Sequence, residues 1–130
     1  MDSIFTKIIN KEIPSYIVEE TEDFIAILDV FPLANGHVLV IPKKQVDYIF
    51  DLEDELLSGL NLFSKKIALA LAKAVPCKRI GTAVIGLEVP HTHIHLVPIN
   101  NVSDIDFSKE KLKFSEEEYK ETLRLIQKYL

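Results

Sequence analysis

The chain has little of what several classes of protein depend on. Its single cysteine, Cys77, leaves no partner for an internal disulfide and is consistent with a reducing compartment. No apolar run approaches the roughly 18 residues that a membrane-spanning helix needs. The first residues have neither the basic region nor the apolar region of a secretory signal. We therefore expect a cytoplasmic protein that has no membrane partner.

Basic side chains are also few. The 130 residues include 15 Lys and Arg against 20 Asp and Glu, for a net charge of −5, and the basic residues form no block. Binding to a nucleic acid polymer by charge neutralisation is therefore not expected, although a local site can still bind a small anion. The composition, 48% hydrophobic and 27% charged, is that of an ordinary globular protein. The length predicts a single domain over residues 1–130.

Hydrophobic periodicity predicts three helices. Ile4, Phe5, Ile8 and Ile9 stand at helical spacing, which predicts a short helix near the N-terminus that stops before Pro14. Further along, apolar residues recur at steps of three and four, which predicts a long helix with Asp51 as its N-cap and Pro76 at its end. Ser115 and Glu118 form a capping-box pattern, which predicts that a last helix begins there.

Five other runs have the composition or the alternation of strands. They cover residues 16–19, 24–30, 37–42, 80–85 and 89–99. In the third run His37, Leu39 and Ile41 are expected to face one way, and the residues between them the other. The early strands are joined by short connections. This order of elements predicts an α+β protein with a mostly antiparallel five-stranded sheet.

Three of the four histidines stand at alternate positions, in the run HTHIHLV that begins at His91. Strict alternation is the period of a half-buried strand, so the imidazoles of His91, His93 and His95 are expected to leave the same face. Histidine is the side chain whose charge and proton position change near neutral pH. This run is therefore the candidate active site, the alternative being three separate structural histidines.

The spacing of the histidines leaves two chemical interpretations open. Residues i and i+2 of a strand lie about 6.6 Å apart, so two neighbouring imidazoles can share a metal, but all three can do so only if the strand bends. No Cys-x-x-Cys motif and no acidic residue within the run supplements them. The other interpretation is that one histidine is a nucleophile and the others bind the oxygens of a phosphate.

Three separated blocks of the chain carry patterns of a known family. The first is IFTKII from Ile4, followed by EIP, and the second is ILDV from Ile27, followed by Pro32 and by GHVLVIPKK from Gly36. The third is the alternating histidine run at His91. Together they resemble the histidine triad (HIT) family, and within it the Hint branch. The resemblance implies a HIT-like fold.

The resemblance also implies an activity, that of a nucleotidyl hydrolase or transferase acting on the α-phosphate of a nucleoside phosphoramidate, a dinucleoside polyphosphate or a similar conjugate. His93 would be the nucleophile and form a nucleotidyl-histidine intermediate that water resolves. Its other ring nitrogen would donate to the carbonyl of His91. His95 and His37 would hold the non-bridging oxygens and assist the leaving group. No metal and no cofactor is implied.

The nucleoside side of the site is implied in the same way. Asp29 occupies the family position that accepts hydrogen bonds from the ribose hydroxyls. The positions of the apolar base pocket, which would hold a purine, are filled by Ile4, Phe5, Ile8, Ile27 and Val30. Without the resemblance these apolar residues would be ordinary core, Asp29 a turn residue, and His37 a histidine at the start of a strand.

The approach to the histidine run departs from the family pattern. Relatives usually carry a longer loop that ends in Gly-Gln-Ser/Thr-Val, whereas here Leu87 replaces the glutamine and Glu88 the hydroxyl residue. These two positions belong to the leaving-group region, and an acidic side chain there repels an anionic leaving group. A nucleotide-binding protein with little turnover therefore stays open as an alternative, as does a metal-binding protein that uses the His-x-His-x-His run.

Residues 101–130 form an extension that matches the family weakly and is expected to be helical from about residue 115. Three placements are open for it, over the sheet, at a subunit contact, or beside the substrate cleft. The resemblance also implies a homodimer, because residues 81–85 and the long helix match the segments that pair subunits in relatives.

Overall fold

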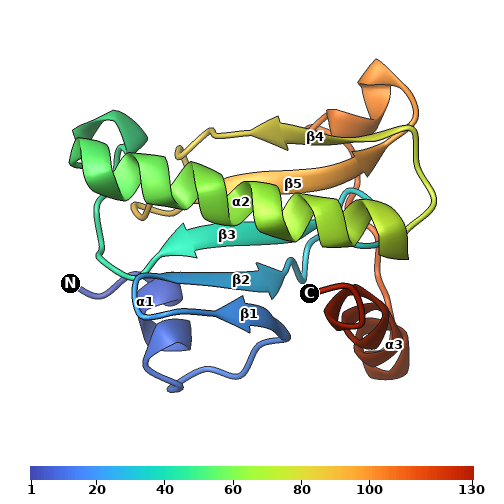
Figure 1. Cartoon of the computed structure of the whole chain (residues 1–130), viewed down its shortest axis with the longest axis horizontal. Helices are drawn as coiled ribbons and strands as arrows, with labels where there is room; N and C mark the ends of the chain where they lie inside the picture. Colours follow the sequence, from blue (N-terminus) through green and yellow to red (C-terminus); the bar gives the residue numbers. More distant parts are fainter.

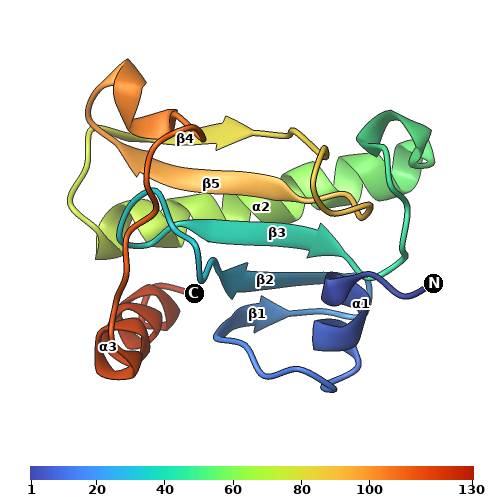
Figure 2. The same ribbon diagram turned by 180° about the vertical axis from the view of Figure 1, so that it is seen from behind.

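A single antiparallel sheet organises the protein (Figures 1 and 2). The computed structural model describes residues 1–130, and its five strands lie in the order β1-β2-β3-β5-β4. The elements are α1 (Ile4–Ile9), β1 (Ile17–Glu20), β2 (Phe24–Leu28), β3 (Val38–Pro42), η1 (Ile49–Asp51), α2 (Asp54–Ala74), β4 (Arg79–Ala83), β5 (Ile94–Ile99), η2 (Val102–Ile105) and α3 (Glu116–Gln127). The predicted α+β class, the five-stranded antiparallel sheet and the three helices are confirmed.

The sheet is covered on both faces. Helix α2 crosses one face (Figure 1), and α1 lies on the other, where the segment after η2 also passes on its way to α3 (Figure 2). Strand β3 shows the expected alternation, because Val38 and Val40 pack into the core under α2 while Leu39 and Ile41 pack with Phe5 and other residues of the opposite face. The face opposite α2 is therefore the one toward which His37 and the α1 side chains converge.

The predicted strand over residues 89–99 is wrong in its first half, because β5 begins only at Ile94. The backbone at His91 and Thr92 forms a turn instead. The N–H of His91 donates to Val89 at 2.8 Å and that of Thr92 to Val46 at 2.7 Å. Only His95 lies within the strand, so the prediction that three imidazoles leave one strand face is also wrong.

The helix boundaries agree with the sequence at the start of α3 and at the end of α2 and differ at the start of α2. Ser115 caps α3 and exchanges the predicted hydrogen bonds with Glu118, and α2 ends before Pro76. Asp51, however, is not the N-cap of α2 but the last residue of η1. The chain extends again at Leu52, whose side chain is buried in the core, and α2 starts two residues later. No helix combines the length and the apolarity needed to cross a bilayer.

The turn before His37 depends on Gly36. This residue has a φ of +87°, and a Cβ there would lie 2.9 Å from Val75 Cγ2 and 3.0 Å from Leu71 Cδ1. Gly86 has a φ of +75° but no atom within 4 Å of its Cβ position. The two glycines therefore share the conformational requirement and differ in the space around them.

We predict that Gly36→Ala lowers the free energy of unfolding by about 2–4 kcal/mol and Gly86→Ala by about 1 kcal/mol. Both substitutions place a side chain in the left-handed region, and only the first also forces the core to move. Urea denaturation of the two variants measures the difference, and equal losses would contradict the packing explanation.

Candidate active site

A cavity of about 440 Å³ lies on the face opposite α2, between α1, the end of β2, the loop before His93 and the segment after η2. It brings together most of the site residues predicted from the sequence, namely Ile4, Phe5, Ile8, Ile27, Asp29, Val30, Leu87, Glu88, His93 and His95. His37 lies behind His95, and His91 faces elsewhere. The cavity thus unites an apolar half near α1 with a polar half near the histidines.

His93 presents a nitrogen that is ready to attack or to accept a proton. Its Nδ1 lies 2.7 Å from the carbonyl oxygen of His91. A carbonyl only accepts, so Nδ1 holds the proton of the neutral ring and Nε2 holds a lone pair. The ring of Phe5 packs edge-on against that of His93, with centroids 4.9 Å apart, and fixes its plane.

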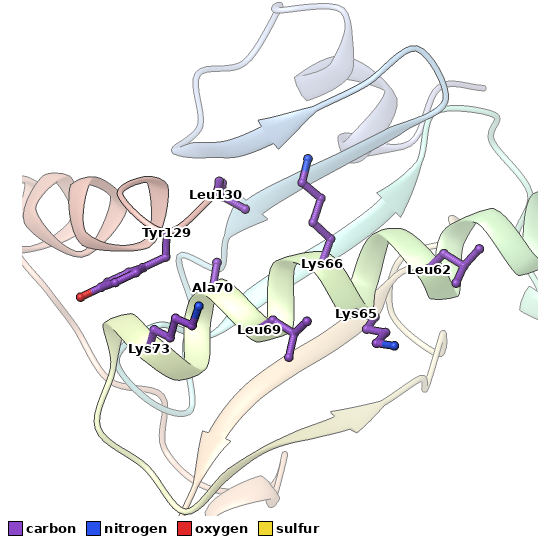
Figure 3. A pocket seen from close by; sticks show the side chains of 8 residues that line it. All are labelled: Leu62, Lys65, Lys66, Leu69, Ala70, Lys73, Tyr129 and Leu130. Atoms are coloured by element: carbon purple, nitrogen blue, oxygen red, sulfur yellow. The ribbon is translucent and has the colours of Figure 1, made fainter.

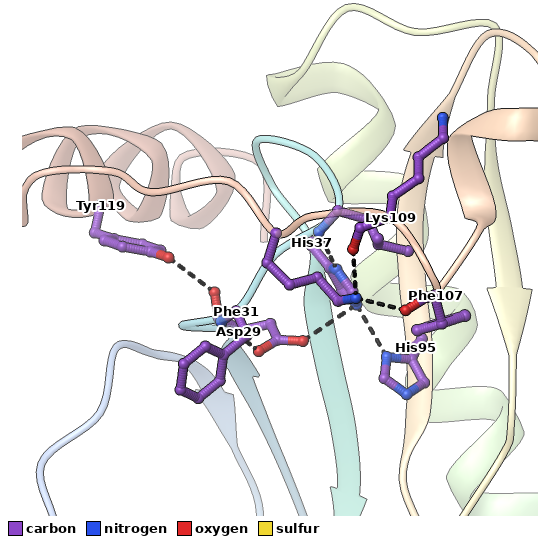
Figure 4. A network of polar contacts seen from close by, with 9 residues as sticks. Asp29, Phe31, His37, His95, Phe107, Lys109 and Tyr119 are labelled. Atoms are coloured by element: carbon purple, nitrogen blue, oxygen red, sulfur yellow. Dashed lines mark hydrogen bonds and ion pairs between the residues drawn. The ribbon is translucent and has the colours of Figure 1, made fainter.

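His37 and His95 form a chain of hydrogen bonds that starts at the backbone (Figure 4). The N–H of Leu33 donates to Nδ1 of His37 at 3.0 Å, so His37 holds its proton on Nε2. That Nε2 lies 2.9 Å from Nδ1 of His95 and donates to it. His95 therefore holds its own proton on Nε2, and because His95 lines the cavity it is a donor for a ligand there.

Burial keeps this pair neutral. Loss of hydration is the largest cause that lowers the pKa of His37 to about 4, and the positive charge of Lys111 acts in the same direction. Burial is also the largest cause that lowers the pKa of His95 to about 3. His37 and then His93 lower this pKa further. Asp29 Oδ2 lies 3.5 Å from Nε2 of His37, while Asp29 Oδ1 accepts from the N–H of Phe31 at 2.9 Å.

His91 supports His93 through its backbone. Its ring is fully buried, donates from Nε2 to the carbonyl of Pro42 at 2.7 Å, and accepts at Nδ1 from the hydroxyl of Ser3 at 2.6 Å. The same hydroxyl oxygen caps α1 by accepting from the N–H of Thr6 at 3.0 Å. The side chain of His91 therefore joins α1 to the end of β3, and its backbone carbonyl is the group that reaches the site.

The hydrogen bonds do not fit the metal-binding interpretation of the histidine run. Both ring nitrogens of His91 are occupied by protein groups. Asp29, His37 and His95 do offer ligand atoms within 4.8 Å of one another. Nδ1 of His37 already accepts from Leu33, however, so a metal at Nε2 requires the neutral ring to lose its one proton and become an imidazolate. A hydrogen-bonded chain with fixed proton positions therefore fits Asp29, His37 and His95 better than a metal site does.

Among the cavity residues that were not predicted, two come from the connecting segment, residues 106–115, that joins η2 to α3. Phe107 packs edge-on against His95, with ring centroids 4.6 Å apart, and Lys111 lines the cavity beside it. Of the three placements open for the extension, the structure places this segment beside the cleft. No local pattern indicated either residue, because their contacts join positions far apart in the chain.

A second hollow of about 420 Å³ lies on α2, on the opposite side of the sheet (Figure 3). Leu62, Leu69 and three lysines of α2 border it together with the C-terminal Tyr129 and Leu130. None of the histidines reaches it. Of these two cavities, only the first is lined by histidines.

The comparisons with known proteins agree with this geometry. A family model described as the HIT domain matches residues 10–102. The chain belongs to the histidine triad (HIT) family. A HIT-like protein of Borreliella burgdorferi is 37% identical to it, over 92% of both chains, and adenosine 5'-monophosphoramidase HNT1 of Saccharomyces cerevisiae is 38% identical, over 73% of this chain and 61% of the yeast protein. The crystal structure of a HIT-like protein from Bartonella henselae superposes with a TM-score of 0.86, at 32% identity over 99% and 96% of the two chains.

We predict that this HIT protein loses stability as the pH falls from about 6.5 toward 4. His37 and His95, with folded pKa values of about 4 and about 3, stay neutral in the folded state while histidines of the unfolded chain bind protons. Each histidine that stays neutral in the folded state at pH 5 lowers the free energy of unfolding by about 2 kcal/mol relative to its value at pH 7.

Urea unfolding at pH 7 and pH 5 measures this loss above the range in which carboxylates titrate. His37→Gln is expected to reduce the difference, because it removes one of the buried neutral rings. A wild-type stability that does not change between the two pH values would contradict the assignment.

Proposed function

We propose that the protein is a nucleotidyl hydrolase or transferase that cleaves a purine nucleoside phosphoramidate, or a related nucleotide conjugate, at its α-phosphate. The observation that carries the proposal is the state of His93. A hydrogen bond from Nδ1 to the carbonyl of His91 leaves the Nε2 lone pair available in a cavity that has room for a nucleotide. The similarity to a yeast protein named an adenosine 5'-monophosphoramidase supports the substrate class.

In the proposed binding mode the nucleoside occupies the half of the cavity near α1. The apolar side chains of Ile4, Phe5, Ile8, Ile27 and Val30 surround the purine base. Asp29 accepts from the ribose hydroxyls, since its carboxylate keeps lone pairs beyond the one that Phe31 uses. This arrangement directs the α-phosphate toward His93 and His95.

The reaction proceeds in two displacements. In the first, the Nε2 lone pair of His93 forms a bond to phosphorus while the bond from phosphorus to the leaving group breaks, and a leaving amine takes up one proton from the solvent. In the second, water forms a bond to phosphorus and gives up one proton to the solvent, and the bond to Nε2 breaks. The two proton transfers balance, and His93 returns to its starting tautomer.

His95 and His37 act as donors in this scheme. Nε2 of His95 donates to a non-bridging oxygen, whose charge grows as the transition state forms. His37 keeps that proton on Nε2 of His95, because its own Nε2 donates to Nδ1 of His95. With pKa values of about 3 and about 4, both rings work as neutral hydrogen-bond donors near neutral pH.

We also propose that the protein forms a homodimer. Strand β4 lies at the edge of the sheet, and Val84 and Ile85, which follow it, are about 42% and 46% exposed. Leu62 and Leu69 of α2 are 69% and 58% exposed. An open edge beside exposed apolar side chains is a surface that a second copy can cover.

The cytoplasmic location stays a prediction from the sequence.

His93→Ala is predicted to reduce turnover of a fluorogenic adenosine phosphoramidate by at least about a thousandfold. The affinity for AMP and the melting temperature are expected to stay near those of the wild type, because the nucleophile is required only for bond breaking. A residual rate within tenfold of the wild type would contradict the assignment of His93. AMP binding by a wild type that turns over no substrate would instead favour a nucleotide-binding protein.

Glu88 is predicted to set the preference between leaving groups. Glu88 lines the same cavity as His93, where a carboxylate repels an anionic leaving group and attracts a cationic amine. Glu88→Ser is therefore expected to narrow the preference for phosphoramidates over dinucleoside polyphosphates by about threefold to tenfold in kcat/KM. Glu110→Ser, which removes the same charge away from the cavity, is the control. An unchanged ratio would show that Glu88 faces only solvent.

A further inference from the structure

The electrostatics of the cavity pose a problem for an anionic ligand. Its charged lining residues are Asp29, Glu88 and Lys111, and two of these three are acidic. Burial holds His37 and His95 in their neutral forms near neutral pH. A phosphate group therefore meets two carboxylates and one cation among the charged side chains that line the cavity.

That cation is held in place without being neutralised. The ammonium of Lys111 donates to the carbonyl oxygens of Phe107 at 2.6 Å and of Lys109 at 2.9 Å. Its nitrogen makes no ion pair within 4.0 Å of any carboxylate oxygen of the chain. An ammonium has three donors, so two carbonyls leave one N–H available.

The connecting segment holds the cation beside the histidine chain, since Lys111 and His95 line the same cavity. Phe107 packs against the ring of His95, and the N–H of Leu112 donates to the carbonyl of Pro32 at 2.9 Å. The segment is thereby bound to the rest of the fold on both sides of Lys111 in the sequence, at Phe107 and at Leu112. Its charge is felt there, since it lowers the pKa of His37.

We propose that Lys111 is a phosphate-binding residue of this site, which contacts the anionic oxygens of the bound nucleotide beside His95. The inference rests on the proposed function and extends it, because it assigns the positive charge of the site to the connecting segment outside the histidine run. The third N–H of the ammonium supplies a charge-assisted hydrogen bond. The backbone carbonyls hold the side chain in position before the ligand arrives, so little side-chain entropy is lost on binding.

The test compares AMP with adenosine by isothermal titration calorimetry at pH 7. For Lys111→Gln we expect the affinity for AMP to fall by about tenfold and that for adenosine to stay within about twofold. The glutamine amide can still donate to one of the two carbonyls, so the segment keeps its position. Lys109→Gln is the matched control, because Figure 4 shows the ammonium of Lys109 pointing away from His37 and His95.

Two further measurements keep the test decisive if Lys111→Gln lowers the melting temperature. Lys111→Arg keeps the charge and is expected to retain AMP affinity within about threefold. In the wild type, added salt is expected to weaken AMP binding and leave adenosine binding unchanged. Salt-independent AMP binding would overturn the proposal.

The remaining outcomes separate this proposal from the proposed function. Equal losses for AMP and adenosine in Lys111→Gln would show a structural role, and unchanged affinities would show that the ammonium does not reach the phosphate. Either result overturns the role of Lys111 and leaves the proposed function in place. A wild type that binds neither ligand would contradict both.

Discussion

The hydrogen bond from Nδ1 of His93 to the carbonyl of His91 is the constraint on which the site depends. It fixes the tautomer of the ring, and the carbonyl is fixed in turn because the His91 side chain is bonded to both Ser3 and Pro42. The N–H of Leu33 has the same function for His37. Main-chain groups do not titrate in the physiological range, so the proton positions of the site are built into the backbone.

Burial has two opposite consequences in this cavity. It prevents His37 and His95 from gaining the positive charge that hydrated histidines gain below about pH 6.5, and it strengthens each hydrogen bond that the neutral rings donate. Recognition of an anion then depends on directed N–H groups and on few full charges. The apolar half of the cavity adds a surface that favours a planar base, so one cavity joins two different kinds of recognition.

The parts of the fold that could be predicted from the sequence are those set by local pattern. The alternation of β3 and the capping box at Ser115 each depend on neighbouring residues, and both were confirmed. The histidine run has the period of a strand, but the N–H of Thr92 donates to Val46, which is far away in the chain. No local pattern contains that contact, and the strand was therefore predicted too long.

The same reason explains which site residues were missed. The apolar positions around Ile4 and Ile27 belong to blocks that resemble a family, and the cavity unites them. Phe107 and Lys111 lie in a segment without periodicity, and their place is set by tertiary contacts to His95 and Pro32. Asp51 satisfied the composition rule for an N-cap, yet the need to bury Leu52 moved the start of α2.

Helix α3 reaches across to the loop that carries Asp29 and His37. The hydroxyl of Tyr119 donates to the carbonyl of Asp29 at 3.0 Å, and that of Thr122 donates to the side chain of Asn35 at 2.9 Å. The family model ends at residue 102, before either of these hydroxyls. Changes confined to the C-terminal part can therefore reshape the site while every histidine stays the same.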